Sequence, residues 1–355
     1  MKDGKVRVGF IGAGWWATSN HMPLLAERPD VELTAVCRLG RDELERVRER
    51  FGFRAAFEDY RTMLREVELD AVFVASPHTL HFEHARAALE HGLHVLCEKP
   101  MCTRAEDARE LVRLADERGL HLVVPYGWHY KPFVQEAKRL LDVGGVGEIQ
   151  YVLCHMASPV RRLLSGEQAV EVEGGQAGDV LFTPEPATWA DPEVAGGGYG
   201  HAQISHSSGM LFWLTGLRPK QVYAQMSAPR SRVDLYDALS VTFEGGAIGT
   251  VSGAGTVPEG RGFQLDIRVF GSDGMLLLDV ERERMELRRH DGADVVELPE
   301  RGAGDYSCEG PPHNFIDLVQ GRATVNHAPG WAATRSVEML DAAYRSALSG
   351  RPEAV

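Results

Sequence analysis

The sequence predicts an α/β domain with parallel strands in residues 1–126, followed by an α+β domain with an open, mainly antiparallel sheet in residues 127–355. Three observations lead to this prediction. The chain has 355 residues, which is more than one ordinary core accommodates. Up to about residue 125, short apolar runs alternate with helical patterns, as in parallel strands joined by right-handed crossovers. Beyond that point, strand patterns follow one another across short turns.

The first domain is expected to contain short buried strands separated by helices. The clearest helix is 105–118, because its apolar residues recur at helical spacing on one face. Thr103 and Glu106 have the spacing of a capping box at its start, and Gly119 is placed to cap its end. The expected strands are 6–11, 33–37, 71–75, 94–97 and 120–124.

The second domain opens with a helix that begins at Pro132 and ends near Gly144. Glu244 and the two glycines after it are typical of a hairpin turn between two strands. Residues 157–198 are rich in glycine, proline and acids, and are expected to be irregular. The expected strands are 149–156, 222–227, 239–243, 247–251, 265–270 and 275–278, and helices are expected near 314–320 and 331–348.

Composition argues against several classes of partner. The net charge of −13 argues against nucleic acid and anionic membranes, because binding to phosphates needs a basic surface. No apolar run approaches the ~20 residues of a membrane span, and the N-terminus reads as a first strand and not as a signal peptide. The five cysteines form no Cys-x-x-Cys pair, so we expect a reducing compartment and a cytoplasmic protein.

A glycine-rich turn directly follows the first expected strand. Gly12 allows a tight turn, Gly14 allows the backbone to approach a pyrophosphate, and Ala17 permits close packing of helix on strand. The helix that follows offers free N–H groups to phosphates. The sequence therefore predicts a Rossmann domain that binds a dinucleotide at this turn, with Trp15 and Trp16 beside it.

The end of the second strand carries arginines where many sites have an acid. NAD sites usually place Asp or Glu here to bind the adenosine ribose, whereas NADP sites place an arginine nearby. This chain has Arg38 and Arg41, which favours NADP over NAD because guanidinium groups hold a 2′-phosphate by charge-assisted hydrogen bonds. The alternative is that Arg38 stacks on adenine and Asp42 caps the next helix.

Several segments together resemble the Gfo/Idh/MocA family of glucose–fructose oxidoreductases and inositol dehydrogenases. The resemblance covers essentially the whole chain, and Glu-Lys-Pro at this distance after the glycine turn is its most specific part. The segments are Ala75-Ser-Pro-His-Thr-Leu-His81, Leu96-Cys-Glu-Lys-Pro100, the triple glycine 196–198 ahead of His206, Trp213-Leu-Thr-Gly216, and the tail 342–352.

The resemblance implies roles for a lysine and a histidine. Lys99 is expected between nicotinamide and substrate, where its ammonium donates to a hydroxyl oxygen and stabilises a developing alkoxide. His206 is expected to take the hydroxyl proton, its alternative being a structural histidine. Glu98 is expected to line the nicotinamide ribose, and the bond before Pro100 is expected to be cis. Further residues expected at the cofactor are Ser76, Pro77, His78 and His81.

The sequence departs from its relatives around this histidine. They usually carry Asp four residues earlier, where this chain has Ala202, so the proton path needs another group. Gln203 lies three residues before His206 on nearly the same helical face and is the expected substitute. Residues expected to meet substrate are Lys99, Trp128, His129, Tyr130, Gln203 and His206.

No metal site is expected. His78, His81 and His84 are spaced three apart at a helix start, yet no acidic or cysteine ligand accompanies them at metal-site spacing.

The family implies hydride transfer between nicotinamide and a secondary alcohol of a sugar, glycoside or inositol. The alternatives are a cofactor-binding sensor without turnover and an enzyme that recycles a tightly bound cofactor. An uncovered apolar sheet face further predicts a homodimer or homotetramer.

Overall fold

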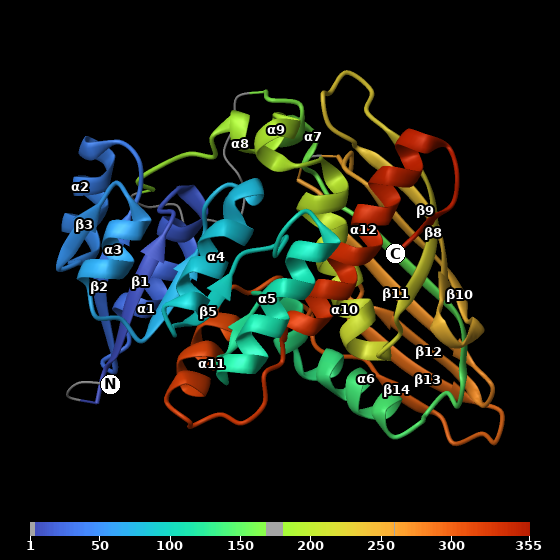
Figure 1. Cartoon of the computed structure of the whole chain (residues 1–355). Coiled ribbons are helices and arrows are strands. Elements are labelled where there is room, and N and C mark those ends of the chain that lie inside the picture. Colours follow the sequence, from blue (N-terminus) through green and yellow to red (C-terminus); the bar gives the residue numbers. More distant parts are fainter. Residues whose placement is uncertain (1–3, 168–179, 259) are drawn as a thin grey trace.

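The computed structural model describes residues 4–167, 180–258 and 260–355 and has two sheets side by side (Figure 1). Helices cover both faces of the first sheet. In the second domain, one face of a larger sheet packs on helices and the other face is open. The predicted fold class is confirmed. Within the described ranges, every helix is too short or too polar to cross a lipid bilayer.

The first domain contains a parallel sheet of six strands within the described part of the chain, in the order β3-β2-β1-β4-β5-β6. Its central strands are buried almost throughout, as in a sheet covered on both faces. The strand order reverses between β1 and β4, and ligands of open α/β sheets bind outside the carboxyl ends of the strands at such a point. The strands are β1 (Val6–Ile11), β2 (Val31–Cys37), β3 (Ala55–Phe57), β4 (Ala71–Val74), β5 (His94–Cys97) and β6 (Leu122–Val123).

The helices of this domain begin with a π-helical turn at Ala17–His21 that leads into α1 (Met22–Ala26). The others are α2 (Arg41–Phe51), α3 (Tyr60–Glu66), α4 (His81–Glu90) and α5 (Ala105–Arg118). The predicted capping box at the start of α5 is wrong. The backbone N–H of Ala105 donates instead to Asp341 Oδ2 at 3.0 Å, so a carboxylate from the second domain replaces the local cap.

The second domain holds a sheet of nine strands among the described residues, in the order β14-β13-β12-β11-β7-β10-β9-β8-β15. Its pairs are antiparallel except for β7 with β10. The turn at Glu244–Gly246 joins β9 to β10 as predicted. The strands are β7 (Ile149–Ala157), β8 (Pro219–Ser227), β9 (Tyr236–Phe243), β10 (Ile248–Ala254), β11 (Gln264–Gly271), β12 (Gly274–Asp279), β13 (Arg284–Arg289), β14 (Val295–Glu297) and β15 (Glu353–Ala354).

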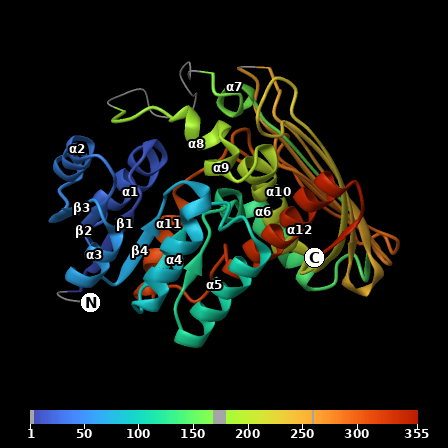
Figure 2. The same cartoon turned by 45° about the horizontal axis from the view of Figure 1, so that its top comes forward.

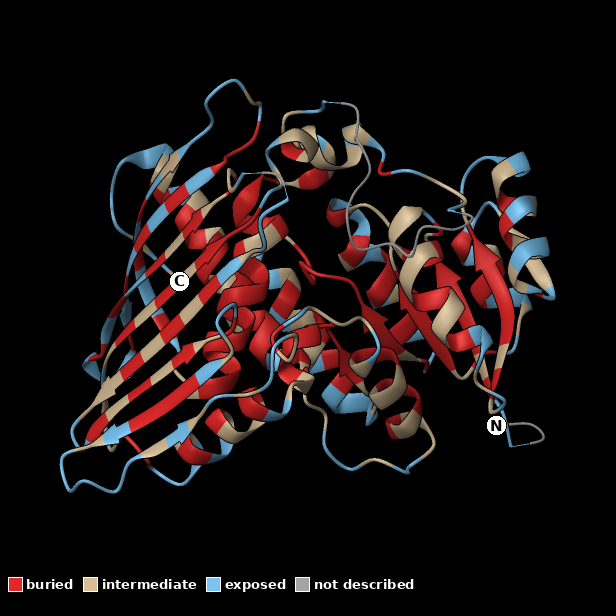
Figure 3. Ribbon diagram, turned by 180° about the vertical axis from the view of Figure 1, so that it is seen from behind, coloured by how far each residue is buried: buried red, intermediate tan, exposed pale blue. Residues whose placement is uncertain are grey.

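Residues along these strands alternate between buried and exposed, so the sheet has one packed face and one open face (Figure 3). The packed face lies on α6 (Pro132–Asp142), α10 (Ser205–Thr215) and α12 (Gly330–Ser349). Tyr223, Tyr236 and Ile248 are exposed on β8, β9 and β10. The open sheet that the sequence predicts is therefore present.

Residues 180–196, which we call the strap, extend from the second domain across the carboxyl ends of the first sheet (Figures 1 and 2). The expected irregular region contains short helices: α7 (Arg161–Leu164) before the strap, and α8 (Pro186–Ala190) and α9 (Pro192–Ala195) within it. The strap is attached at both ends. The carbonyl of Leu181 accepts from Arg46, and the carbonyl of Val194 accepts from Thr79 Oγ1 at 3.1 Å.

A late segment of the chain, before α12 and β15, returns to the first domain. Helix α11 (Gly310–Val319) buries Phe315 and Ile316 in the core of the Rossmann domain, and Phe315 packs edge-on against Phe73 of β4 at 5.4 Å. Arg28 forms an ion pair with Asp317 at 2.8 Å in the same place. The two domains are therefore joined by shared packing as well as by the chain.

Candidate active site

The glycine turn after β1 has the shape that a pyrophosphate requires. Gly12 has a φ of +94°, and a Cβ on it would lie 2.4 Å from the carbonyl carbon of Ala75. A Cβ on Gly14 would meet nothing within 4 Å, so the turn faces open space there. Ala17 is buried where the helix packs on the strand. The turn thus fits a dinucleotide in the way the sequence predicts.

Glu98, at the end of β5, is buried and directed into the domain. Its Oε1 accepts from Trp16 Nε1 at 2.8 Å and lies 2.6 Å from His21 Nε2, while Oε2 accepts from the backbone N–H of Lys99 at 3.1 Å. Burial raises the pKa of Glu98, but the interactions with His21 and Lys99 outweigh burial and hold that pKa below its ordinary value. Glu98 therefore fixes the loop that carries Lys99, and a contact with the ribose stays a prediction.

Lys99 is buried, with 7% of its surface exposed, and its peptide bond to Pro100 is cis, as expected. Its Nζ donates to the backbone carbonyl of Ala202 at 2.9 Å and lies 5.6 Å from the ring centre of Trp189 on the strap. Burial lowers the pKa of Lys99, and Glu98 opposes that effect. The ammonium group is thus held by a neutral acceptor in a dry environment.

Ala202 lies in a π-helical turn, Gly200–Ile204, that leads into α10. At the start of this turn, Asp234 Oδ1 and Oδ2 accept from the backbone N–H groups of Gly198 and Gly200, each at 2.8 Å, and Oδ1 also accepts from Tyr344 at 3.0 Å. A Cβ on Gly198 would lie 2.2 Å from the carbonyl oxygen of Asp234. The triple glycine therefore permits the close approach that aims the Ala202 carbonyl at Lys99.

His206, one turn further, shares this buried pocket. Its ring packs edge-on against Trp128 at 5.6 Å and Tyr306 at 5.4 Å. Its Nδ1 is buried without a hydrogen-bond partner among the described residues. Burial, together with the charge of Lys99, lowers the pKa of His206 well below its ordinary value. No hydrogen bond joins Gln203 to His206 within the described parts of the chain, so the role of Gln203 stays a prediction.

The histidines after β4 connect the loops around Lys99. His81 Nδ1 lies 2.7 Å from the carbonyl of Pro100, and its Nε2 lies 2.7 Å from the carbonyl of Ser76. His78 Nδ1 lies 3.1 Å from the carbonyl of Ala195, and its ring packs edge-on against Trp189 at 5.2 Å. His81 thus joins two loops of the first domain, and His78 joins them to the strap. Pro77 lies in the same loop. Among the described residues, no three His, Cys, Asp or Glu side chains gather as a metal site.

The three residues expected at the substrate occupy different surroundings. Trp128 contacts His206, and its Nε1 donates to the carbonyl of Gly304 at 3.0 Å. His129 is fully buried, with its ring stacked on Trp213 at 4.5 Å. Tyr130 donates its hydroxyl to Asn314 Oδ1 at 3.0 Å. The structure therefore brings Trp128 to His206, while the contacts of His129 and Tyr130 are structural, and the roles of all three toward substrate stay predictions.

Arg38 lies just after β2, where Rossmann domains usually bind the adenosine ribose. Its Nη1 donates to the carbonyl of Ala13 at 2.7 Å, and its guanidinium stacks on the ring of Phe182 at 4.1 Å. Arg46 of α2 lies 5.5 Å from the centre of the same ring. Arg41 is exposed at the start of α2. The structure thus places Arg46 beside Arg38, and the role of Arg41 stays a prediction.

Sequence reasoning missed several residues of this site. In the loop before α11, Tyr306 packs against His206, and Cys308 lies near Lys99. Phe182 of the strap packs against Arg38. Burial raises the pKa of Cys308 to about 12, so its thiol is un-ionised. These residues lie in loops with no periodic pattern. The weak signal was a set of aromatic residues in polar segments.

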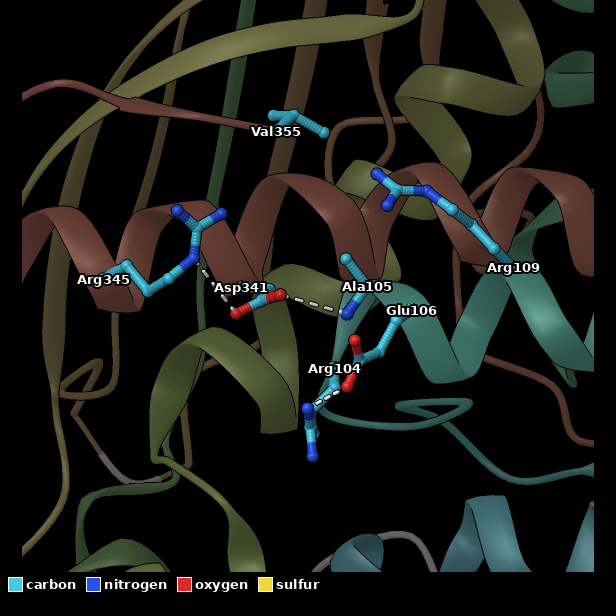
Figure 4. A pocket seen from close by; sticks show the side chains of 7 residues that line it. All are labelled: Arg104, Ala105, Glu106, Arg109, Asp341, Arg345 and Val355. Atoms are coloured by element: carbon cyan, nitrogen blue, oxygen red, sulfur yellow. Dashed lines mark hydrogen bonds and ion pairs between the residues drawn. The ribbon is translucent and has the colours of Figure 1, made fainter.

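A separate surface hollow of about 340 Å³ lies at the start of α5 (Figure 4). Its arginines already pair with carboxylates: Arg104 with Glu106, Arg109 with Glu338, and Arg345 with Asp341 at 3.5 Å. The hollow thus holds no uncompensated charge for an anion. It is lined by Arg104, Ala105, Glu106, Arg109, Asp341, Arg345 and Val355.

Comparison with known families and proteins gives a consistent result. Residues 6–126 match the model of an oxidoreductase family with an NAD-binding Rossmann fold, and residues 134–277 match the GFO/IDH/MocA C-terminal domain. The chain is 30% identical to a D-xylose 1-dehydrogenase [NADP(+)] of Haloarcula marismortui over 50% of each chain. It is 36% identical to a D-glucoside 3-dehydrogenase of Escherichia coli over 42% of each chain. These matches span about half the length of those relatives.

A longer match is to a scyllo-inositol 2-dehydrogenase (NADP(+)) of Bacillus subtilis, with 27% identity over 89% of this chain and 88% of the relative. Among solved structures, an oxidoreductase domain protein from Kribbella flavida superposes with a TM-score of 0.79 at 21% identity, with 99% of each chain covered. A levoglucosan dehydrogenase in complex with NADH and L-sorbose superposes with a TM-score of 0.78 at 19% identity over 99% of each chain. At this identity the structural matches establish the fold.

Proposed function

The chain belongs to the Gfo/Idh/MocA family of NAD-binding oxidoreductases, and we propose that it moves a hydride between a nicotinamide dinucleotide and a secondary alcohol of a sugar, glycoside or inositol. The observation that carries this proposal is that Lys99 and His206 are both buried, and lie close enough for the charge of Lys99 to lower the pKa of His206. Relatives named as xylose, glucoside and inositol dehydrogenases support the substrate class.

Lys99 is suited to polarise the oxygen of the substrate. Its partner is the neutral carbonyl of Ala202, and the ammonium group lies in a region from which water is largely excluded. A positive charge in such a place stabilises a developing alkoxide more strongly than it would in water. The bound nicotinamide would accept or supply the hydride at its ring carbon. Lys99 holds the substrate oxygen while that transfer occurs.

His206 is suited to take the proton of the hydroxyl group. Because its pKa is lowered well below the ordinary value, the imidazole is neutral at neutral pH and can accept a proton. Its Nδ1 is buried without a hydrogen-bond partner among the described residues, so no contact of this atom fixes which ring nitrogen carries the proton. In the direction of alcohol oxidation, His206 accepts the hydroxyl proton as the hydride leaves the same carbon. In reduction it returns that proton.

For the cofactor, we propose NADP in preference to NAD. Arg38 follows β2, and the end of that strand carries no acid to repel a 2′-phosphate. A second candidate is an enzyme that keeps its cofactor through successive turnovers. The strap favours that candidate because its Phe182 contacts Arg38 and its Trp189 lies near Lys99, so one segment reaches both ends of the proposed cofactor site. Cofactor that survives gel filtration of the purified protein would support retention, and full loss of cofactor would exclude it.

We also propose a cytoplasmic homo-oligomer, either a dimer or a tetramer. The apolar residues exposed on β8, β9 and β10 support association through the open sheet face. The five cysteines are free, which supports a reducing compartment. Light scattering tests the assembly, and a monomer at micromolar concentration would refute it.

The first experiment is a fluorescence titration of cofactor-free protein with NADPH and NADH. Two of the chain's six tryptophans lie in the glycine turn, so bound dinucleotide should quench emission. The protein is then assayed on aldoses, glycosides and inositols through the absorbance of reduced nicotinamide, with Lys99→Met as the blank. Binding of neither dinucleotide would refute the proposal. Binding without turnover on every class would favour a sensor.

A further inference from the structure

The ring of Phe182 holds two arginines that come from different parts of the first domain. The guanidinium of Arg38, just after β2, stacks on this ring at 4.1 Å, and that of Arg46, inside α2, lies 5.5 Å from its centre. Arg46 also donates to the backbone carbonyl of Leu181, next to Phe182, at 3.4 Å. The second domain thus supplies the surface on which both cations rest.

Arg38 is fixed on two sides. Its Nη1 donates to the carbonyl of Ala13 inside the glycine turn at 2.7 Å, and one face of its guanidinium is covered by Phe182. Its Nε is buried and has no hydrogen-bond partner among the described residues. A hydrogen-bond donor in this state is costly unless a ligand satisfies it.

The two guanidinium groups lack an anion. Within the described residues, no carboxylate lies within ion-pair distance of Arg38 or Arg46. The charge of Glu43 raises the pKa of Arg38 without a direct ion pair between the two side chains. Two cations held side by side repel each other, and an anion between them removes that repulsion. Arg38 and Arg46 together therefore form a cationic site that an anion could occupy.

The place of this pair identifies the anion. Ala13 belongs to the turn that faces the pyrophosphate, and Arg38 follows the strand whose end binds the adenosine ribose in Rossmann domains. We propose that Phe182 is a cofactor-selectivity residue, which holds Arg38 and Arg46 where both meet the 2′-phosphate of NADP(H). This inference rests on the proposed function, and it makes selectivity a joint property of both domains.

The physical reason is preorganisation. A free arginine samples many rotamers, and that freedom is lost when it binds a phosphate. The Ala13 carbonyl and the Phe182 ring remove the freedom of Arg38 before the ligand arrives. Adenosine without a 2′-phosphate makes no use of the pair. The effect of Phe182 is therefore confined to ligands that carry this group.

The test uses fragments that fill the adenosine end alone. We would measure the Kd of 2′,5′-ADP and of 5′-AMP by calorimetry for the full chain and for Phe182→Ala. Loss of the cation–π contact should weaken 2′,5′-ADP by roughly fivefold and leave 5′-AMP within about twofold. Phe182→Tyr keeps an aromatic face and should behave as the parent. Trp331→Ala, which removes an exposed ring and its cation–π contact with Arg335 on α12, is the control and should change neither Kd.

Several outcomes would overturn the inference. An equal loss for both fragments would make Phe182 a general adenosine contact, and tighter binding would make it an occupant of the adenine place. An unchanged ratio of the two Kd values would remove its role in selectivity. If Phe182→Ala does not fold, Phe182→Leu replaces it, because leucine keeps the apolar packing without an aromatic face. A parent protein that binds neither fragment refutes the proposed function, whereas a parent that prefers 2′,5′-ADP with Phe182→Ala unchanged refutes this inference alone.

Discussion

The two ends of the proposed cofactor site differ in how deeply their residues are buried. At the nicotinamide end, Lys99 and His206 are 7% and 6% exposed, and their neighbours come from β5, the π-helical turn, the strap and the loop before α11. At the adenosine end, Gly14 and Arg46 are exposed and Arg38 is half-buried. Buried charges interact strongly and change their pKa, whereas exposed charges are screened by solvent and salt.

This difference teaches where each kind of chemistry belongs. A reaction that moves a proton and a hydride needs a dry environment with fixed distances, and the protein assembles it from segments that are far apart in the sequence. Recognition of a phosphate needs donors on a surface that the ligand can reach and leave. The comparison therefore predicts large effects on turnover at one end and moderate effects on affinity at the other.

The largest effect is expected from the buried pair. Lys99→Met and His206→Ala should each lower kcat by about 10²–10⁴-fold, because one removes the donor to the alkoxide and the other removes the base. Both variants should bind NADPH within about twofold of the parent by fluorescence titration. A variant that keeps more than a tenth of the parent kcat would break the distinction between the two ends.

The next largest effect, on dinucleotide affinity, is expected in the glycine turn, where substitution of Gly12 serves as the comparison for substitution of Gly14. Gly14→Val should weaken both NADPH and NADH by about 10–100-fold with an unchanged Tm, because its side chain would enter the open space proposed for the pyrophosphate. Gly12→Ala should lower the Tm as well, since its φ is +94° and its Cβ would meet the backbone at Ala75. If both variants lost only affinity, the packing role of Gly12 would be wrong.

Asp234 is expected to have a smaller effect on turnover, of about tenfold. Asp234→Asn leaves one acceptor oxygen where two now bind the N–H groups of Gly198 and Gly200, so the carbonyl of Ala202 should lose its fixed aim at Lys99. A positioning role predicts a lower kcat with little change in KM. Titration of NADPH-binding sites gives the amount of folded enzyme, so kcat per binding site separates this from a merely structural defect, which leaves that value unchanged. Asp234→Glu should recover part of the lost kcat.

The smallest effect per group concerns stability against pH. Burial lowers the pKa of His129 to about 3 and of His84 to about 4. Between about pH 6.5 and pH 4 the unfolded chain binds protons at these histidines and the folded chain does not, so stability is present above pH 6.5 and is lost as pH falls. Each histidine contributes at most about 1.4 kcal/mol per pH unit. Urea midpoints at pH 7, 6 and 5 should decrease in that order, and a constant midpoint would contradict it.

The first domain could be predicted from the sequence because its signals are local. β1, β5 and α5 begin and end at the expected residues, and Gly12, Gly14 and Lys99 follow strand ends directly. The missed strands have a physical explanation. β3 and β14 have three residues each, and β13 carries arginines on an outer part of the sheet. Such short or charged strands form because neighbouring strands pair with them.

The parts of the site that escaped prediction depend on contacts between distant segments. The partner of Lys99 is the backbone carbonyl of Ala202 and not a side chain. Because every residue has a backbone carbonyl, the residue type at position 202 could not predict this contact. Asp234 acts on the glycine loop from 36 residues away in sequence. Phe182 meets Arg38 across the domain boundary. The expected capping box failed for the same reason, since a carboxylate from α12 occupies the start of α5.

The return of α11 into the first domain has a consequence for how the chain unfolds and how it can be recombined. Phe315 and Ile316 complete a core whose strands end almost two hundred residues earlier. Residues 1–126 alone would therefore expose the apolar surface that these side chains cover. The molecule should melt as one cooperative unit, and a chimera that exchanges the Rossmann domain with a relative must carry α11 along with it.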